Sequence, residues 1–210
     1  MKLLIIGATG GTGRELIKQA LEAGHQLTAL VRNPDRLKIA HPNLHIVKGN
    51  VLDYAKVEEA VTGQDAVLSA LGHKRFIIYT TILSEGTGNI IRAMEKQQVN
   101  RFICITTLGI NDSRFKLGLY YTLFVIPVIV FFYFMDKAKQ EKLIRNSNLN
   151  WTIVRPGQLT NGKFTGKYKH GENLGNYILT KMISRANVAH FMLSQLTDPS
   201  YLKKAVGVVY

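Results

Sequence analysis

Residues 1–37 read MKLLIIGATGGTGRELIKQALEAGHQLTALVRNPDRL, and this stretch decides the fold. An apolar run over 3–6 leads into Gly7, Gly10 and Gly13, and a segment with helical spacing of apolar residues follows. A turn of this kind joins a strand to a helix N-terminus, where free backbone N–H groups and the helix dipole favour an anion. The sequence therefore predicts a phosphate-binding turn.

The three glycines have distinct expected roles in that turn. Gly7 permits the tight bend, Gly10 lets the backbone approach a pyrophosphate, and Gly13 allows the helix to pack closely on the strand. The spacing is GxxGxxG rather than GxGxxG, and no GK[ST] follows to make a P-loop. The alternative is a tight strand-to-helix connection without a ligand, but the position after the first strand favours nucleotide binding.

Apolar, β-branched runs alternate with amphipathic segments along the rest of the chain. This rhythm predicts one domain over 1–210, of the α/β, Rossmann-like, doubly wound class, with a mainly parallel sheet and helices on both faces. Gly24 is placed to end the first helix, and Asn187 to cap the last. Six strands are expected at 2–7, 26–31, 44–49, 65–72, 101–106 and 151–156, helices at 55–62, 80–98, 136–147 and 187–197, and a final strand at 205–210.

The amino-acid composition limits which partners and which compartment we expect for this chain. The formal net charge is +13, but the basic residues are dispersed and form no recognisable nucleic-acid-reading element, so we expect no nucleic acid. The single cysteine, Cys104, lies in an apolar run and cannot form an internal disulfide, which indicates a reducing, cytoplasmic compartment. No Cys/His cluster suggests a metal.

The residues after the second expected strand indicate whether the site prefers NADP(H) or NAD(H). NAD sites place Asp or Glu there to bind the ribose 2′-hydroxyl, about 20 residues after the glycines. This chain has LVRNPDRL instead, with Arg32 as the first polar residue and Arg36 one turn later. A guanidinium matches a 2′-phosphate through charge-assisted hydrogen bonds, so NADP(H) is expected and NAD(H) is the less favoured coenzyme. The negative charge of Asp35 would disfavour a 2′-phosphate, but Asp35 comes after Pro34, in a turn.

At this point the chain resembles a known family. GATGGTGRE, LVRNPDRL, GNVLD, GQDAVLSALG, SEGTGNIIRAM, RFICITTLG, LNWTIVRPGQLT and ISRANVAHFMLSQLTD occur in the order seen in atypical short-chain dehydrogenase/reductases. Among these, the chain is most similar to the compact NAD(P)H-binding proteins that include biliverdin-IXβ/flavin reductase, within the NmrA-like superfamily. The resemblance covers nearly the whole chain and is more specific for the cofactor than for a substrate.

The resemblance implies roles for particular positions along the carboxyl edge of the sheet. It places the adenine beside the GNVLD motif, with Asp53 as an acceptor for the exocyclic amine, and the nicotinamide ribose beside the end of the fourth strand. The implied cofactor residues are Gly7, Thr9, Gly10, Gly11, Thr12 and Gly13 at the pyrophosphate, Arg32 and Asn33 at the 2′-phosphate, Val51, Leu52 and Asp53 at the adenine, and Ala70, Leu71, Gly72, Thr106, Lys137, Pro156, Gly157 and Gln158 toward the nicotinamide.

Candidate catalytic residues are Tyr133, Lys137 and Thr107. Tyr133 and Lys137 match the YxxxK spacing of catalytic short-chain dehydrogenases, which puts both side chains on one face of a helix. The ammonium could then lower the pKa of the phenol and hold the ribose. The alternative is that Tyr133 is a packing residue within the aromatic run VFFYFM. Thr107 ends the fifth strand, where related proteins carry Ser or Thr beside the substrate.

Residues 117–135, LGLYYTLFVIPVIVFFYFM, carry no formal charge and are nearly long enough to span a bilayer. A single span would separate the sixth strand from the sheet it joins, and Pro127 would kink a continuous helix. We therefore expect a lid or broken helix over an apolar substrate pocket, or a homodimer interface. The open alternative is peripheral membrane attachment through the flanking lysines.

Two classes of function fit these observations. The first is an NADPH-dependent reductase that transfers a hydride to a planar or hydrophobic acceptor, such as a flavin, a tetrapyrrole or a quinone. The second is an NADP-binding regulatory or redox-sensor protein with little or no turnover. Steady-state NADPH oxidation against a small panel of acceptors separates them.

Overall fold

A computed structural model describes residues 1–73 and 76–210 and shows one central sheet. Its strand order is β3-β2-β1-β4-β5-β6-β10-β8, with every neighbouring pair parallel except β10 and β8. The first six positions have the doubly wound order of dinucleotide-binding folds, which confirms the expected fold class. The strands are β1 (Lys2–Ile6), β2 (Gln26–Val31), β3 (Leu44–Lys48), β4 (Ala66–Ser69), β5 (Arg101–Ile105), β6 (Asn150–Pro156), β8 (Lys169–Gly171) and β10 (Lys204–Val209).

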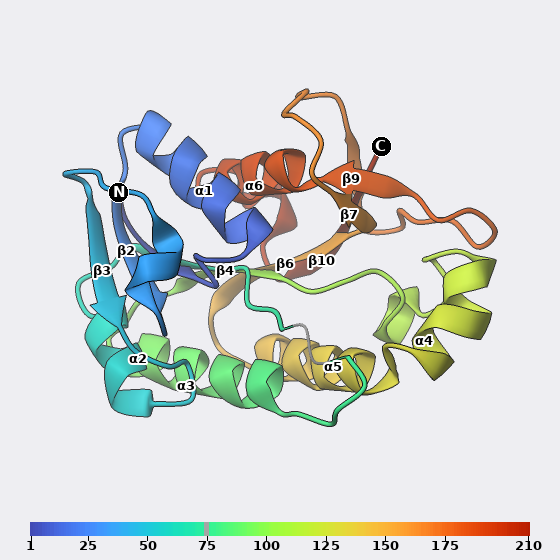
Figure 1. Cartoon of the computed structure of the whole chain (residues 1–210), viewed down its shortest axis with the longest axis horizontal. Coiled ribbons are helices and arrows are strands. Elements are labelled where there is room, and N and C mark those ends of the chain that lie inside the picture. Colours follow the sequence, from blue (N-terminus) through green and yellow to red (C-terminus); the bar gives the residue numbers. More distant parts are fainter. Residues whose placement is uncertain (74–75) are drawn as a thin grey trace.

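Helices cover both faces of this sheet (Figure 1). On one face lie α1 (Gly11–Glu22) and α6 (Arg185–Ser194), and on the other lie α2 (Tyr54–Val61), α3 (Ile82–Lys96) and α5 (Phe131–Arg145). The alternation along β1 explains why both faces need cover. Leu4 and Ile6 enter the core beneath α2, α3 and α5, whereas Leu3 and Ile5 enter the core beneath α1 and α6.

Helix ends follow the local sequence, with one correction. Gly24 has φ +78° just beyond α1, in the left-handed region that glycine adopts without strain, and ends the helix as expected. The prediction that Asn187 caps α6 is wrong. The cap is Ser184, whose hydroxyl accepts from the Asn187 N–H, while Asn187 is buried within the helix and donates its side-chain amide to Thr165 and Tyr210.

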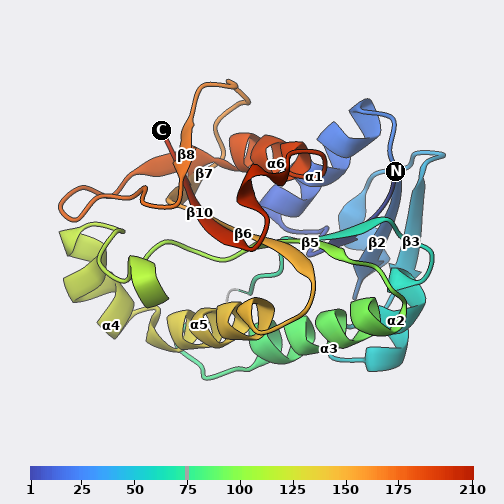
Figure 2. The same cartoon turned by 180° about the vertical axis from the view of Figure 1, so that it is seen from behind.

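The apolar segment 117–135 is a broken helix. A π-helical turn over Tyr121–Val125 continues into α4 (Ile126–Val128), which contains Pro127, and α5 starts at Phe131. Within the described residues, no single helix has the length and apolarity to cross a membrane, and only Tyr121–Val128 with Phe131–Arg145, a pair bent by 98°, meets that test jointly. Beside this segment runs the chain between β8 and β9 (Met182–Ser184), where β9 pairs with β7 (Gln158–Thr160) (Figure 2).

Candidate functional site

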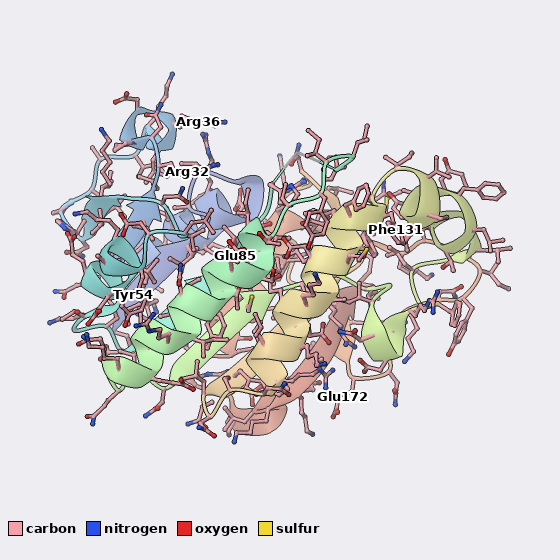
Figure 3. The ribbon with its side chains drawn as sticks, turned by 90° about the horizontal axis from the view of Figure 1, so that it is seen from below. Arg32, Arg36, Tyr54, Glu85, Phe131 and Glu172 are labelled. Carbon is pink, nitrogen blue, oxygen red and sulfur yellow. The ribbon has the colours of Figure 1, made fainter. Side chains whose placement is uncertain are left out.

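The carboxyl ends of the parallel strands bring most of the predicted site residues to one edge of the sheet. Figure 3 shows Arg32 and Arg36 at one end of this edge and Phe131, at the start of α5, at the other. Between them lie the turn after β1 and the ends of β4, β5 and β6. Open α/β sheets bind ligands in this position, where the strand order reverses between β1 and β4.

The turn after β1 can adopt its conformation only because glycines at key positions carry no side chain. Gly7 has φ +79°, and a Cβ there would overlap the carbonyl oxygen of Ala70 at the end of β4. A Cβ on Gly13 would overlap the Gly7 carbonyl oxygen and lie 2.8 Å from Cα of Ala8. The first turn of α1 therefore approaches β1 closely enough that only glycine fits, as the spacing predicts.

The N-terminus of α1 is open to an anion. Its N-cap is Gly10, which has no side chain to accept the first N–H groups, and the first turn holds no acidic residue. By contrast, Asp53 caps α2, and the carboxylate of Asp136 accepts from the N–H groups of Leu83 and Ser84 at the start of α3. The α1 terminus can thus use these donors on a pyrophosphate.

Arg185 is a site residue that sequence reasoning missed. Its side chain, from the first residue of α6, lies over Gly11, where a Cβ would come within 2.5 Å of its Cδ atom. Its Nη1 atom donates to Oδ1 of Asn161 at 2.7 Å. This places a guanidinium beside the open helix N-terminus, where it can add a second positive group to a bound pyrophosphate. Packing of α6 on α1 creates this proximity, and no local motif signals it.

Arg32 is exposed immediately after β2, in the position expected for a 2′-phosphate contact. Asn33 accepts from the Asp35 N–H through its side-chain oxygen at 3.1 Å and so caps the short 3₁₀ helix Pro34–Leu37. Arg14 braces this region by donating to the Arg36 carbonyl oxygen at 2.7 Å. The turn is held in place by these bonds, while the Arg32 side chain faces solvent.

The GNVLD segment forms the neighbouring part of the edge. Val51 is buried against Gly86 of α3, whereas Leu52 is exposed and available to a ligand. One carboxylate oxygen of Asp53 accepts from the N–H groups of Ala55 and Lys56 as the cap of α2. The second oxygen of Asp53 remains the one that could accept from an adenine amine.

The ends of β4, β5 and β6 form the rest of the edge. Ala70, Leu71 and Gly72 follow β4, and the Thr107 hydroxyl donates to the Leu108 carbonyl oxygen. Thr106 is buried and donates to Glu141 at 3.2 Å, and Glu141 is itself ion-paired with the buried Arg155. Pro156, Gly157 and Gln158 link β6 to β7, and Thr9 and Thr12 flank Gly10 and Gly11.

Lys137 is buried, and its ammonium group already has three acceptors. Nζ donates to the carbonyl oxygens of Leu71 at 3.1 Å and Ile105 at 3.0 Å, and to Oε1 of Gln140 at 3.0 Å. An ammonium has three protons, so these bonds use all of them. Lys137 thereby joins the carboxyl ends of β4 and β5, directly beneath the expected nicotinamide position. Its direct contact with the cofactor stays a prediction.

Burial lowers the pKa of Lys137 to about 8, and this has a consequence for stability. Between this value and its ordinary value of 10.5, the unfolded chain holds a proton that the folded chain has released. The contribution of Lys137 to stability must therefore rise with pH across that window, by up to about 1.4 kcal/mol per pH unit. We expect the stability of the wild type relative to Lys137→Met to increase by about 1–2 kcal/mol between pH 8 and 10.

Urea unfolding of both proteins at several pH values measures this difference. Because the charge of Lys137 lowers the pKa of the Cys104 thiol, the pair is compared in a Cys104→Ser background, which removes the titration of the thiol. Parallel stability curves for the two proteins over this range would show that Lys137 does not titrate there.

Tyr133 lies in an aromatic cluster. Its ring packs edge-on against His73 and Phe76, with centroid distances of 5.0 and 5.5 Å, and its hydroxyl lies 3.6 Å from where a Cβ on Gly72 would be. Nζ of Lys137 lies 5.9 Å from the centre of the Tyr133 ring. Burial, with a smaller contribution from Asp136, raises the pKa of the phenol above its ordinary value. The lowered phenol pKa that the YxxxK spacing suggests is therefore not found, and a catalytic role stays a prediction.

A family model described as NAD(P)H-binding matches residues 7–199. The chain belongs to this NAD(P)H-binding family. An uncharacterised chloroplast protein of Arabidopsis thaliana is 32% identical over 178 residues, which cover 79% of this chain and 61% of that protein. The relative is therefore considerably longer than the matched part, and the resemblance that the motifs indicate is confirmed.

Solved structures show the same fold over nearly their full length. An anaerobillin reductase of Escherichia coli O157:H7 matches with a TM-score of 0.83 and 23% identity, covering 100% of this chain and 97% of that one. A wide-type short-chain dehydrogenase/reductase of Veillonella parvula, solved in complex with NADP, matches with a TM-score of 0.81 and 19% identity, covering 100% and 94%. The glycine cradle and the open N-terminus of α1 fit the cofactor of the family.

Proposed function

We propose that the protein is an NADPH-dependent reductase that transfers a hydride to a planar or hydrophobic acceptor, such as a flavin, a tetrapyrrole or a quinone. The observation that carries this proposal is the aromatic cluster of His73, Phe76, Tyr133 and Phe134 beside Gly72, at the end of β4. A flat apolar acceptor would stack against such a wall at the nicotinamide end of the site.

The choice of NADPH over NADH is supported by charge. Arg32 is exposed at the end of β2, where an acidic residue would select NADH, and Arg36 lies one turn further. The Veillonella parvula structure of the same fold was solved with NADP. In this proposal Arg32 binds the 2′-phosphate, and the α1 N-terminus with Arg185 binds the pyrophosphate.

Bound NADPH would supply the hydride, and the chain's own residues would position the two reactants. Lys137 fixes the carbonyl groups of Leu71 and Ile105, which sets the spacing of β4 and β5 under the nicotinamide. The aromatic cluster would give the acceptor a flat apolar surface on which to stack. Because positioning alone can supply a large part of a rate acceleration, the reduced acceptor can take its proton from solvent.

The test is steady-state NADPH oxidation with riboflavin, biliverdin and menadione as acceptors. Saturable turnover with at least one of them supports the reductase. A second function, that of an NADP-binding regulatory protein, is favoured by the protons of Lys137 being fully used and by the raised pKa of Tyr133. Tight NADPH binding with no turnover on any acceptor would replace the reductase with this alternative.

The hydroxyl of Tyr133 has a separate test. Because Lys137 donates all its protons elsewhere and burial makes the phenol a weaker acid, Tyr133→Phe should change turnover at saturating acceptor by less than about threefold. NADPH affinity should be unchanged. A loss of about 100-fold in turnover with intact cofactor binding would instead make the hydroxyl the proton donor. Rates are compared over a range of pH so that a shifted optimum is not read as a loss.

A further inference from the structure

Three segments form one apolar end of the molecule, next to the start of α5: residues 76–79, 115–135 and 177–182. The ring of Tyr79 packs on Phe132, with centroids 6.0 Å apart, which joins the first segment to α5. The Leu119 N–H donates to the Ile178 carbonyl oxygen at 3.2 Å, which joins the second segment to the third. Figures 1 and 2 show α4 and the chain before β9 extending together from the same end of the sheet.

The outward side chains of this apolar end are strongly exposed. Ile77 and Val128 are each 76% exposed, and Ile178 is 74% exposed. A helix on a protein surface normally turns polar residues to water, and contiguous apolar patches mark interaction sites. The other exposed large apolar residues of the three segments are Phe76, Ile78, Tyr79, Phe115, Leu119, Tyr120, Leu123, Phe124, Ile129, Phe131, Phe132, Tyr177, Leu179 and Met182, with Met135 at the boundary.

The exposed apolar side chains of segment 115–135 are not ones that should pack into the core of this chain, because other side chains of the segment already do so. Leu117 is buried against Leu108 and Val209, and Tyr121, Ile126 and Phe134 pack against that small cluster. The broken helix therefore carries apolar side chains on both sides, one facing the protein and one facing outward. The outward side calls for an apolar environment outside the chain.

The charged residues around the three segments indicate what kind of surface the apolar end contacts. Residues 76–84, 113–135 and 173–197 contain no Asp or Glu, although the chain has 14 of them. Basic side chains lie against the apolar residues instead. The guanidinium of Arg114 is 5.6 Å from the centre of the Phe115 ring, and Nζ of Lys139 is 3.2 Å from the Tyr79 hydroxyl. Lys116 and Lys181 complete this basic rim.

We propose that this apolar end docks peripherally on an anionic lipid bilayer, with its exposed side chains in the acyl boundary and its basic rim at the headgroups. An apolar face rimmed by lysine and arginine is the arrangement that binds anionic membrane surfaces. A second copy of the chain fits less well, because a symmetric contact would bring two basic rims together. The proposal does not depend on turnover of any acceptor.

Co-sedimentation with lipid vesicles tests the proposal. The wild type should bind vesicles of equal parts phosphatidylcholine and phosphatidylglycerol at least tenfold more strongly than vesicles of phosphatidylcholine alone. The double variant Val128→Glu/Ile178→Glu should lose at least tenfold of that binding. Its matched control is Leu143→Glu/Leu202→Glu, which changes two exposed leucines outside the three segments and should bind within twofold of the wild type.

NADPH affinity of each variant shows that it is folded, since these side chains lie outside the cofactor site. Binding to neither vesicle, or equal loss in the test and control variants, would overturn the proposal. A dimer detected by light scattering that is abolished by Val128→Glu/Ile178→Glu, without vesicle binding by the wild type, would assign the surface to a second copy instead.

Discussion

Replacing Arg32 with glutamate should weaken NADPH binding by about 100-fold, while NADH affinity should change by less than about threefold. The wild-type Arg32 is exposed immediately after β2, the position from which dinucleotide-binding folds contact the ribose 2′ substituent. A charge-assisted bond to phosphate is worth about 1.5–3 kcal/mol, and glutamate adds repulsion toward the same phosphate. NADH has no phosphate at that position, so it escapes both effects.

Calorimetric titration of both coenzymes into Arg32→Glu measures the two affinities. Lys169→Glu is the matched control, because it makes the same change of charge at an exposed position on β8, at the opposite edge of the sheet from β2 and β3. We expect the control to affect both coenzymes weakly and equally. Equal losses of NADPH and NADH affinity in Arg32→Glu would remove this residue from the 2′-phosphate site.

Gly13→Ala should destabilise the protein by about 3 kcal/mol and abolish tight coenzyme binding. The added methyl group would overlap the carbonyl oxygen of Gly7 and approach Cα of Ala8, and backbone atoms cannot move aside as a flexible side chain can. The first turn of α1 would have to move away from β1. Its N–H groups would then no longer point at a pyrophosphate.

Gly88→Ala in α3 is the matched control for Gly13→Ala. Apart from the adjoining residues and the backbone of α3 itself, no atom lies within 4 Å of a Cβ built on Gly88, so the substitution meets no obstacle. Alanine is the better helix former by about 0.8–1 kcal/mol, and Gly88→Ala should stabilise the chain. Urea unfolding and NADPH titration are carried out on both variants. Retained stability and affinity in Gly13→Ala would show that α1 does not need this close approach.

The sequence predicted the parts of the fold that depend on local pattern. Glycine spacing marked the turn after β1, and apolar runs such as 101–106 marked strands buried on both faces. Pro127 indicated that segment 117–135 is broken, and the chain does bend by 98°, although the bend lies between Val128 and Phe131 rather than at Pro127 itself. Each of these signals depends only on a few neighbouring residues, so contacts with distant parts of the chain do not change it.

Features that depend on distant contacts were not predicted. Arg185 reaches Gly11 only because α6 packs on α1, and the sequence around either residue contains no motif that predicts this contact. The YxxxK spacing put Tyr133 and Lys137 on one helix face correctly, but it could not show that the carbonyl groups of Leu71 and Ile105 take the protons of the ammonium. At the start of α6, the sequence analysis named Asn187 as the cap residue, but Ser184 caps the helix and the Asn187 side chain instead hydrogen-bonds Thr165 and Tyr210.

The most direct measurement is calorimetric titration of NADPH and NADH into the purified wild-type chain. We predict saturable binding of NADPH at one site per chain, with weaker binding of NADH and a preference for NADPH that falls as salt screens Arg32. Absence of any heat or fluorescence change with either coenzyme at millimolar concentration would contradict the assignment of the turn after β1 as a dinucleotide site.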